Sequence, residues 1–339
     1  MDKETSTYVL MGIEVSGVQS FIFSTGKLKE MVGASQIIVE VASDLYDEVT
    51  SLLELTPALR PMDGSNWIVT SRNNAGVLRA LLPNRETGKK FLKEFSSLAL
   101  DKWPGLPLNG ALVDCGFNQE SLLSAGQELS KLIEGRRARY PVPKGLNLLP
   151  PLQMAPLDGL AAFERDYAGE KTTLVSWPSS VKRNVKTIDR ANKRLKDEFN
   201  EVFTDLSLKI GSETISWPVE LEAKWVDDFD EMLEGREKPR LALIHLDVND
   251  LGHMMAGSGK DNLTTDPAKV IEEQNKKSAL IDQLNKSSFS AALRTAIELD
   301  LSQHNFDVKN ITEYLIPLRP LVIGGDDVTV LVRADLAFP

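Results

Sequence analysis

The stretch LVIGGDDVTVLVRA, residues 321–334, constrains the fold more than any other part of this chain. Two runs of aliphatic and β-branched residues flank two glycines and two aspartates, a pattern typical of a β-hairpin. A hairpin turn uses one or two such residues and does not require adjacent carboxylates. The stretch therefore predicts a pair of strands that carries concentrated negative charge at its tip, on Asp326 and Asp327.

The hairpin is the last element of a β-α-β-β order that occurs twice in the chain. Around the hairpin we expect a strand and turn at 240–255, a helix at 278–303 and the hairpin at 318–334. An earlier part is expected to contain a strand at 8–23, a helix at 27–53, a hairpin at 66–83, a helix at 85–103 and a strand at 108–117. The earlier order, β-α-β-β-α-β, is that of a ferredoxin-like unit.

With 339 residues the chain is longer than one ordinary core, so several domains are expected. We predict an α+β protein with a first ferredoxin-like unit at 1–117, a mostly helical insert at 118–239 and a second unit at 240–339. The second unit has no visible second helix or fourth strand. We therefore expect it to be incomplete, with the apolar side of VTVLVRA partly uncovered unless another segment or subunit supplies the rest.

Composition excludes several classes of protein. Hydrophobic residues make up 42% and charged residues 26% of the chain, as in soluble globular proteins, and no apolar run is long enough to span a membrane. The N-terminus lacks a secretion signal, so a cytoplasmic protein is expected. The single cysteine excludes an internal disulfide and a cysteine-rich zinc site. A net charge of −10 argues against wrapping a long nucleic acid, although not against binding a small nucleotide with metal ions.

Asp247 is expected to join the hairpin aspartates. It ends the first strand of the second unit, which lies beside the hairpin in a β-α-β-β order, about 4.8 Å away. Carboxylates this close repel one another unless cations neutralise them, and Mg²⁺ prefers such oxygen ligands. Gly324 and Gly325 would let a nucleotide approach the backbone. The alternative is a plain hairpin turn with a solvated carboxylate pair, and with Asp247 as an ordinary strand-end residue.

Two paired motifs resemble a known family. The GGDD hairpin, preceded by HLDVNDLG and a helix, resembles the polymerase-cyclase palm of the large subunit of type III CRISPR effector complexes. GIEVSGVQSFIF followed by KLKEMVGAS resembles the start of the first palm in the same family. The resemblance covers 8–117 and 240–339. It implies two palms face to face that join ATP into cyclic oligoadenylates, second messengers of antiviral defence.

The resemblance also implies a set of site residues. Asp247, Asp326 and Asp327 would be catalytic and would bind Mg²⁺ or Mn²⁺, with ATP as substrate. The nucleotide-binding positions implied are Ser16, Gly17, Gly33, Ala34, Ser35, Asn249, Asp250, Gly324 and Gly325. The implied partners are nucleoside triphosphates, together with guide RNA and other effector subunits or a second copy of the chain.

The chain also departs from the family pattern. The first unit has RNNAGV, residues 72–77, where the second has GGDD, so we expect no catalysis there. No HD nuclease segment precedes the first palm, and no cysteine cluster lies between the palms, which indicates a shortened, HD-less relative. The basic stretch 182–196 and the segment GRRARYPVPK (135–144) are each either a surface for RNA or another partner, or solvated protein surface.

Two other functions stay open. Diguanylate cyclases share this palm and hairpin, although Asp327 and Val328 stand where their motif has Glu and Phe. A catalytically inactive scaffold that binds nucleotide or RNA is the third possibility, and the intact carboxylates count against it.

Overall fold

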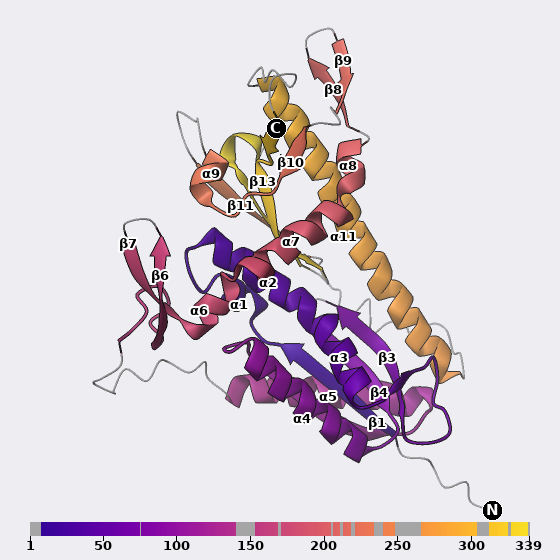
Figure 1. Cartoon of the computed structure of the whole chain (residues 1–339). Coiled ribbons are helices and arrows are strands. Elements are labelled where there is room, and N and C mark those ends of the chain that lie inside the picture. The colour runs from indigo at the N-terminus through magenta and orange to yellow at the C-terminus, as the bar shows by residue number, and fades with distance from the viewer. Residues whose placement is uncertain are drawn as a thin grey trace, which may run out of the picture. The chain divides into compact units, whose positions relative to one another are not determined.

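The computed structural model describes residues 8–74, 76–139, 153–168, 171–204, 206–210, 213–217, 221–233, 240–247, 266–303, 312–324 and 327–337 (Figure 1). Contacts divide the chain into two compact units. The first unit comprises Met1–Thr25, Ile37–Val181 and Asp250–Leu280, and the second comprises Gly26–Gln36, Lys182–Asn249 and Ile281–Pro339.

The first unit is built on a five-stranded sheet of order β2-β3-β4-β1-β5. Its strands are β1 (Tyr8–Val15), β2 (Thr56–Pro57), β3 (Trp67–Asn74), β4 (Val77–Leu82) and β5 (Leu108–Cys115). The helices of this part of the chain are α1 (Val18–Ile22), α2 (Leu28–Ala42), α3 (Asp44–Leu52), α4 (Arg85–Lys102) and α5 (Gln119–Arg139). Strand β1 pairs antiparallel with both β4 and β5, so the predicted ferredoxin-like order is confirmed.

Alternating side chains place a helical layer on each face of this sheet. Ala111, Val113 and Cys115 of β5 pack in one cluster with Leu129 and Ile133 of α5. On the other face the ring of Tyr46 of α3 packs at a tilt against Phe91 of α4, and its hydroxyl lies 2.8 Å from the Thr70 hydroxyl of β3. The period of two along the strands explains the division, because successive residues point to opposite faces.

The predicted insert, 118–239, contributes to both units. In the first unit α5 is followed by the hairpin of β6 (Ala162–Ala168) and β7 (Lys171–Ser176) and by α6 (Trp177–Lys182). The second unit contains α7 (Val185–Glu198), α8 (Asn200–Thr204), β8 (Ser207–Ile210), β9 (Glu213–Ser216), β10 (Glu222–Lys224) and α9 (Phe229–Leu233). Most of the basic stretch 182–196 lies in α7, which buries Ile188, Ala191 and Leu195 and exposes Lys186, Arg190, Lys193 and Lys196.

The second unit has a three-stranded antiparallel sheet of order β11-β14-β13. Its elements are β11 (Leu241–Asp247), α11 (Pro267–Gln303), β12 (Glu313–Leu315), β13 (Leu318–Gly324), β14 (Asp327–Arg333) and the 3-10 turn η2 (Ala334–Leu336). The expected strand, helix and hairpin are confirmed. The helix begins at Pro267 and not at 278, and β12 pairs in parallel with β10, which the sequence pattern did not indicate.

The expectation that VTVLVRA would be partly uncovered was wrong. Val328, Leu331 and Val332 of β14 are buried, and Val332 packs in one cluster with Phe289, Leu293 and Ile297 of α11. The exposed apolar side chains lie instead on β11, where Leu243 and Leu246 are more than half exposed. In the first unit β5 pairs with β1 at the corresponding edge, whereas the described residues provide no strand there for β11.

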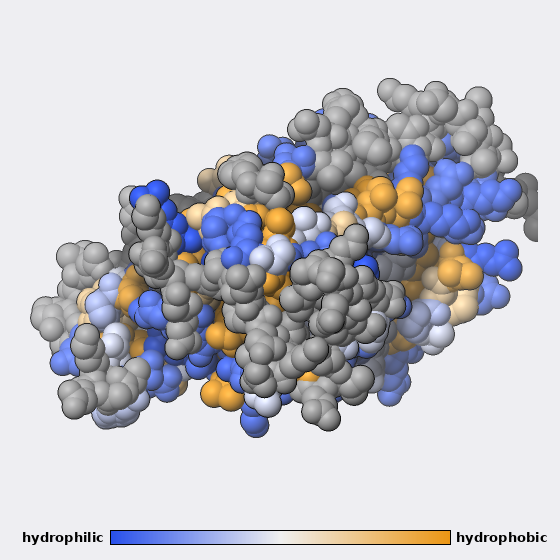
Figure 2. Space-filling view, turned by 90° about the horizontal axis from the view of Figure 1, so that it is seen from above, coloured by the Kyte–Doolittle hydropathy of each residue, from blue (hydrophilic) through white to orange (hydrophobic). Residues whose placement is uncertain are grey.

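The surface view mixes hydrophilic and hydrophobic residues in small groups on the face shown (Figure 2). Among the described residues, no helix has the length and apolar character needed to cross a membrane.

Candidate functional site

Asp247 and Asp327 face each other at one end of the second sheet. Asp247 is the last residue of β11, Asp327 is the first residue of β14, and the two are register partners in the antiparallel pair. Directly opposed residues of an antiparallel pair project from the same face, so both carboxylates lie on one side of the sheet. Asp247 is exposed, and the Asp327 side chain is 31% exposed, so both are accessible to a ligand.

His245 supports this pair from the next position on the same face. Its Nδ1 lies 2.9 Å from the Thr329 hydroxyl, which orients the ring, and its Nε2 lies 3.8 Å from Asp327 Oδ1. Thr329 is buried and is the register partner of His245. His245 lies on β11, an edge strand of the sheet, and its ring lies beside one of the candidate metal-binding carboxylates.

The pair supplies two of the three predicted metal-binding carboxylates. Two opposed acids with hard oxygen atoms are suited to a divalent cation, because like charges directly opposite one another are otherwise unfavourable. The part of the chain that the structure describes contains no group of three or more His, Cys, Asp or Glu that could hold a metal ion. Asp326, the third predicted ligand, lies outside the described residues, so the complete ligand set stays a prediction.

The remaining predicted residues of the second unit are described only in part. Gly324 is the last residue of β13, is buried and pairs with Asp327, with a φ of 157°. It therefore borders the acid pair, and its approach by a nucleotide stays a prediction. Gly325, Asn249 and Asp250 lie outside the described residues, and their roles stay predictions.

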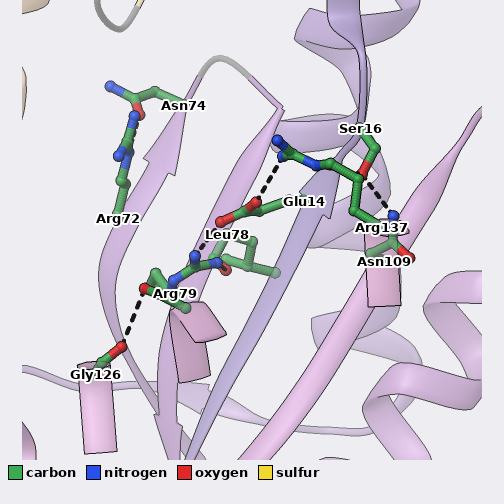
Figure 3. A network of polar contacts seen from close by, with 10 residues as sticks. Glu14, Ser16, Arg72, Asn74, Leu78, Arg79, Asn109, Gly126 and Arg137 are labelled. Atoms are coloured by element: carbon green, nitrogen blue, oxygen red, sulfur yellow. Dashed lines mark hydrogen bonds and ion pairs between the residues drawn. The ribbon is translucent and has the colours of Figure 1, made fainter. Parts of the chain in front are cut away.

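The first unit has a different polar arrangement at the corresponding strand end (Figure 3). Glu14 of β1 is the register partner of Val77, the first residue of β4. Its two carboxylate oxygens are both engaged: Arg79 of β4 donates to Oε1, and Nη2 of Arg137 lies 3.3 Å from Oε2. The carboxylate is thus neutralised by two guanidinium groups of the same unit, consistent with the prediction that this unit does not catalyse.

Ser16 and Gly17, predicted to contact nucleotide, follow this strand end. The Ser16 hydroxyl accepts a hydrogen bond from Asn109 Nδ2 at 2.5 Å and a longer one from Arg137 Nε at 3.4 Å. Gly17 has φ 60° and ψ 49°, the left-handed conformation that glycine adopts without a steric penalty. The glycine thus has a backbone reason to be here, and contact with a nucleotide stays a prediction.

Gly33, Ala34 and Ser35 lie within α2 in the second unit. A Cβ atom on Gly33 would lie 1.7 Å from the carbonyl oxygen of Lys182, so this glycine permits close backbone packing. Ala34 is fully buried and Ser35 is partly exposed. Packing therefore explains Gly33 and Ala34 without a ligand, and their predicted contact with nucleotide remains untested.

The sequence pattern does not indicate the two arginines that hold Glu14. Arg79 and Arg137 are 65 and 123 positions away from Glu14 in the chain. The only sequence signal was the basic segment GRRARYPVPK, which contains Arg137 but does not indicate its partner.

The comparisons with known proteins bear on the fold. No protein-family model and no curated protein matches the chain. Among solved structures, the apo Csm1–Csm4 cassette matches with 13% identity and a TM-score of 0.53, over 99% of this chain and 46% of that chain. The same cassette with one ATP matches with 15% identity and a TM-score of 0.53, over 99% and 47%. Csm1 of T. onnurineus matches with 16% identity and a TM-score of 0.50, over 98% and 45%.

These matches confirm the expected resemblance at the level of fold. The chain has the fold of Csm1 subunits of type III CRISPR complexes over nearly its whole length. It spans about half the length of those chains. At this sequence identity the activity of the solved proteins does not transfer with the fold.

Proposed function

Because this chain has the fold of Csm1 subunits of type III CRISPR complexes, we propose that it is a metal-dependent nucleotidyltransferase that joins ATP into cyclic oligoadenylates. The observation that carries the proposal is the register pairing of Asp247 with Asp327 at the tip of the hairpin sheet. The pairing brings together two carboxylates that are 80 residues apart in the numbering, 327 minus 247, on one accessible face.

In the proposed reaction the 3′-hydroxyl of one ATP attacks the α-phosphate of another, and pyrophosphate leaves. The last round closes the ring. Asp247 and Asp327, with Asp326 as the third predicted ligand, would hold divalent ions, which activate the attacking hydroxyl and neutralise the leaving group. The two strands fix the separation of the carboxylates, so positioning and electrostatic stabilisation provide the rate enhancement.

His245 would restrict the orientation of Asp327. Its ring is held by the buried Thr329 hydroxyl and approaches one oxygen of Asp327. His245 is therefore a positioning residue in this proposal, because it acts through Asp327.

The solved neighbours support the choice of ATP as substrate. Csm1–Csm4 cassettes of this fold have been solved with AMPPNP, with one ATP and with cA4. Those ligands belong to those proteins, and by analogy we assign ATP to this chain. The same structures pair Csm1 with a second subunit, so we also propose that this chain works with another subunit of an effector complex.

The test is product analysis of the purified protein. The protein is incubated separately with ATP and GTP, with Mg²⁺ or Mn²⁺, and the products are identified by mass spectrometry. We expect cyclic oligoadenylates from ATP, and their loss in Asp247→Asn but not in Asp101→Asn, a control at an exposed position on α4. Cyclic dinucleotides from GTP would instead favour a diguanylate cyclase. Binding of ATP without any product, with partner subunits added, would favour an inactive scaffold.

A further inference from the structure

Strand β13, which leads to the hairpin tip, contains a β-bulge. Its register with β14 shifts between Pro320 and Val322, so Leu321 is an extra residue in this strand. A bulge bends its strand and changes which side chains share a face with those of the neighbouring strand. On the tip side of the bulge Gly324 pairs with Asp327. The bulge therefore affects how the hairpin places the candidate metal-binding carboxylate.

The first unit has a bulge at the equivalent place. In β3 the register shifts between Thr70 and Arg72, and three residue pairs then lead to the hairpin tip, as in β13. Counted back from the two bulges, Val69 of β3 corresponds to Arg319 of β13. Both side chains are buried, each at 1% exposure. An aliphatic side chain thus fills this position in one unit, whereas the other unit buries a guanidinium group there.

Arg319 is a buried charge with few polar contacts. Its Nη1 donates to Asn192 Oδ1 of α7 at 2.6 Å and lies 3.6 Å from Asp227 Oδ1. Its guanidinium carbon lies 5.9 Å from the ring centroid of Trp225. Its Nε is buried and has no hydrogen-bond partner within the part of the chain that the structure describes. Burial lowers the pKa of Arg319 to about 10, so the group is still charged at neutral pH.

The contacts of Arg319 supply direction more than stability. A buried ion pair is often no more stabilising than apolar side chains of similar volume, because both charges lose their water. The hydrogen bond to Asn192 and the ion pair with Asp227 require the side chain at one position, since polar contacts weaken steeply with distance and angle. Apolar contacts tolerate a shift along the strand more readily. Arg319 therefore fixes β13 immediately before its bulge.

We propose that Arg319 is a positioning residue, which holds β13 in its bulged register and thereby places the hairpin that carries Asp327 for binding a divalent ion. Without this anchor the strand can lose its bulge, and a slip by one residue exchanges the two faces of a strand. Gly324 would then no longer pair with Asp327, and the turn between them would change. The reaction that this arrangement serves rests on the proposed function, whereas the register of the strand does not.

Arg319→Met tests the proposal, because methionine is long and flexible but carries no charge. Hydrogen–deuterium exchange of the whole chain, read by mass spectrometry, reports the strand pairing. We expect the amides of 322–324 and 327–329 to exchange about tenfold faster or more, with a melting temperature that is unchanged or higher. Unchanged exchange in these strands would overturn the proposal. Faster exchange throughout the second unit with a lower melting temperature would also overturn it, because Arg319 would then only stabilise the fold.

Asn192→Ala tests the same contact from the side of α7, and does so even if Arg319→Met does not fold. Alone, it should also speed exchange at 322–324, because Arg319 loses its nearest acceptor. Added to Arg319→Met, it should change that exchange by less than about twofold, since the contact is already absent. Additive effects would overturn the proposal. The control is Lys224→Met, which breaks a half-exposed pair with Glu313 in the same unit and should leave the exchange within about twofold.

Product formation separates this proposal from the proposed function. With ATP, Arg319→Met should slow the reaction by about 10- to 100-fold and raise the Mg²⁺ concentration that gives half of the maximal rate. A smaller folded fraction would lower the rate without changing that concentration. If the unmodified chain forms no oligoadenylate, but exchange in the hairpin depends on Arg319, the positioning role stands and the proposed function fails. If unmodified chain and variant form oligoadenylates equally well, the proposed function stands and the positioning role fails.

Discussion

Arg333 and Asp300 form a buried ion pair at the C-terminal end of β14, and Asp327 is the first residue of the same strand. Nη2 of Arg333 lies 2.6 Å from Asp300 Oδ1, and the two side chains are 4% and 1% exposed. The Tyr314 hydroxyl donates to the other oxygen of Asp300 at 2.7 Å. The pair connects the central strand of the second sheet to α11, and so fixes the strand whose first residue belongs to the candidate metal site.

We expect Asp300→Ala to lower the free energy of unfolding by about 3 kcal/mol, because Arg333 then keeps, among the described residues, only the half-exposed Asp335 as its ion-pair partner. Urea unfolding followed by circular dichroism measures the change. The control is Glu313→Ala, which breaks a half-exposed pair with Lys224 at 3.1 Å and should cost less than about 1 kcal/mol. Equal costs for the two variants would contradict a special role for the buried pair.

Asp247→Asn should have opposite effects with and without ligand. Without metal it removes one of two directly opposed like charges, so the free energy of unfolding should rise by about 0.2–1 kcal/mol. With Mg²⁺ and ATP present, the rise in melting temperature seen in the unmodified chain should disappear, because ligand binding stabilises the folded state. Thermal melts of the unmodified chain and the variant, each with and without Mg²⁺ and ATP, provide the measurement. A rise in melting temperature with Mg²⁺ and ATP that is as large in the variant as in the unmodified chain would show that Asp247 does not bind the metal.

Changes at the hairpin of the first unit should affect product formation much less than changes at the second. The Asn74 side chain donates to the Ser278 hydroxyl at 2.7 Å and has no carboxylate to hold an ion. We expect Asn73→Ala with Asn74→Ala to slow oligoadenylate synthesis by less than about tenfold, and Asp326→Ala with Asp327→Ala by at least about 100-fold. Initial rates with ATP and Mg²⁺ decide this, and equally deep losses would show that the first hairpin takes part in the chemistry.

Gly33→Ala should destabilise the protein, although alanine has a higher helix propensity than glycine. The added Cβ would lie 1.7 Å from the Lys182 carbonyl oxygen, and backbone must move to accommodate it, at a cost of about 2 kcal/mol or more. Gly126→Ala in α5 is the matched control, because nothing lies within 4 Å of its added Cβ. That variant should gain about 0.5–1 kcal/mol. Chemical denaturation compares the two, and a neutral Gly33→Ala would refute the close packing.

Cys115 should react slowly with thiol reagents in the folded chain. Burial raises the pKa of its thiol from 9.0 to about 11, and the thiolate is the reactive form. At pH 8, labelling should become fast only after unfolding by denaturant. Because the pKa of the thiol is higher in the folded state, its burial makes its full contribution to the free energy of unfolding below pH 9. This contribution is lost as the pH rises toward 11. Rapid labelling of the native chain would contradict the burial.

Local sequence patterns determined most of the secondary structure of the first unit and the position of the acidic hairpin of the second. The alternating apolar residues of β13 and β14 and the helical spacing in α4 and α11 each depend on neighbours a few positions away. The element order of the first unit then restricted its topology to the ferredoxin-like sheet that the structure contains. The proximity of Asp247 to the hairpin followed from the same topology.

Tertiary structure decided which side chains meet. Register places Asp327 opposite Asp247, packing against Lys182 gives Gly33 its role, and folding of α5 onto the first sheet brings Arg137 to Glu14. The sequence alone determined the strands and helices of the first unit and the hairpin of the second, because those depend on short-range periodicity and backbone preference, but not the start of α11 at Pro267 or the pairing of β10 with β12. It did not determine that Asp247 lies opposite another acid, whereas Glu14 contacts arginines. Such pairs depend on strand register and on helix packing between residues distant in the chain.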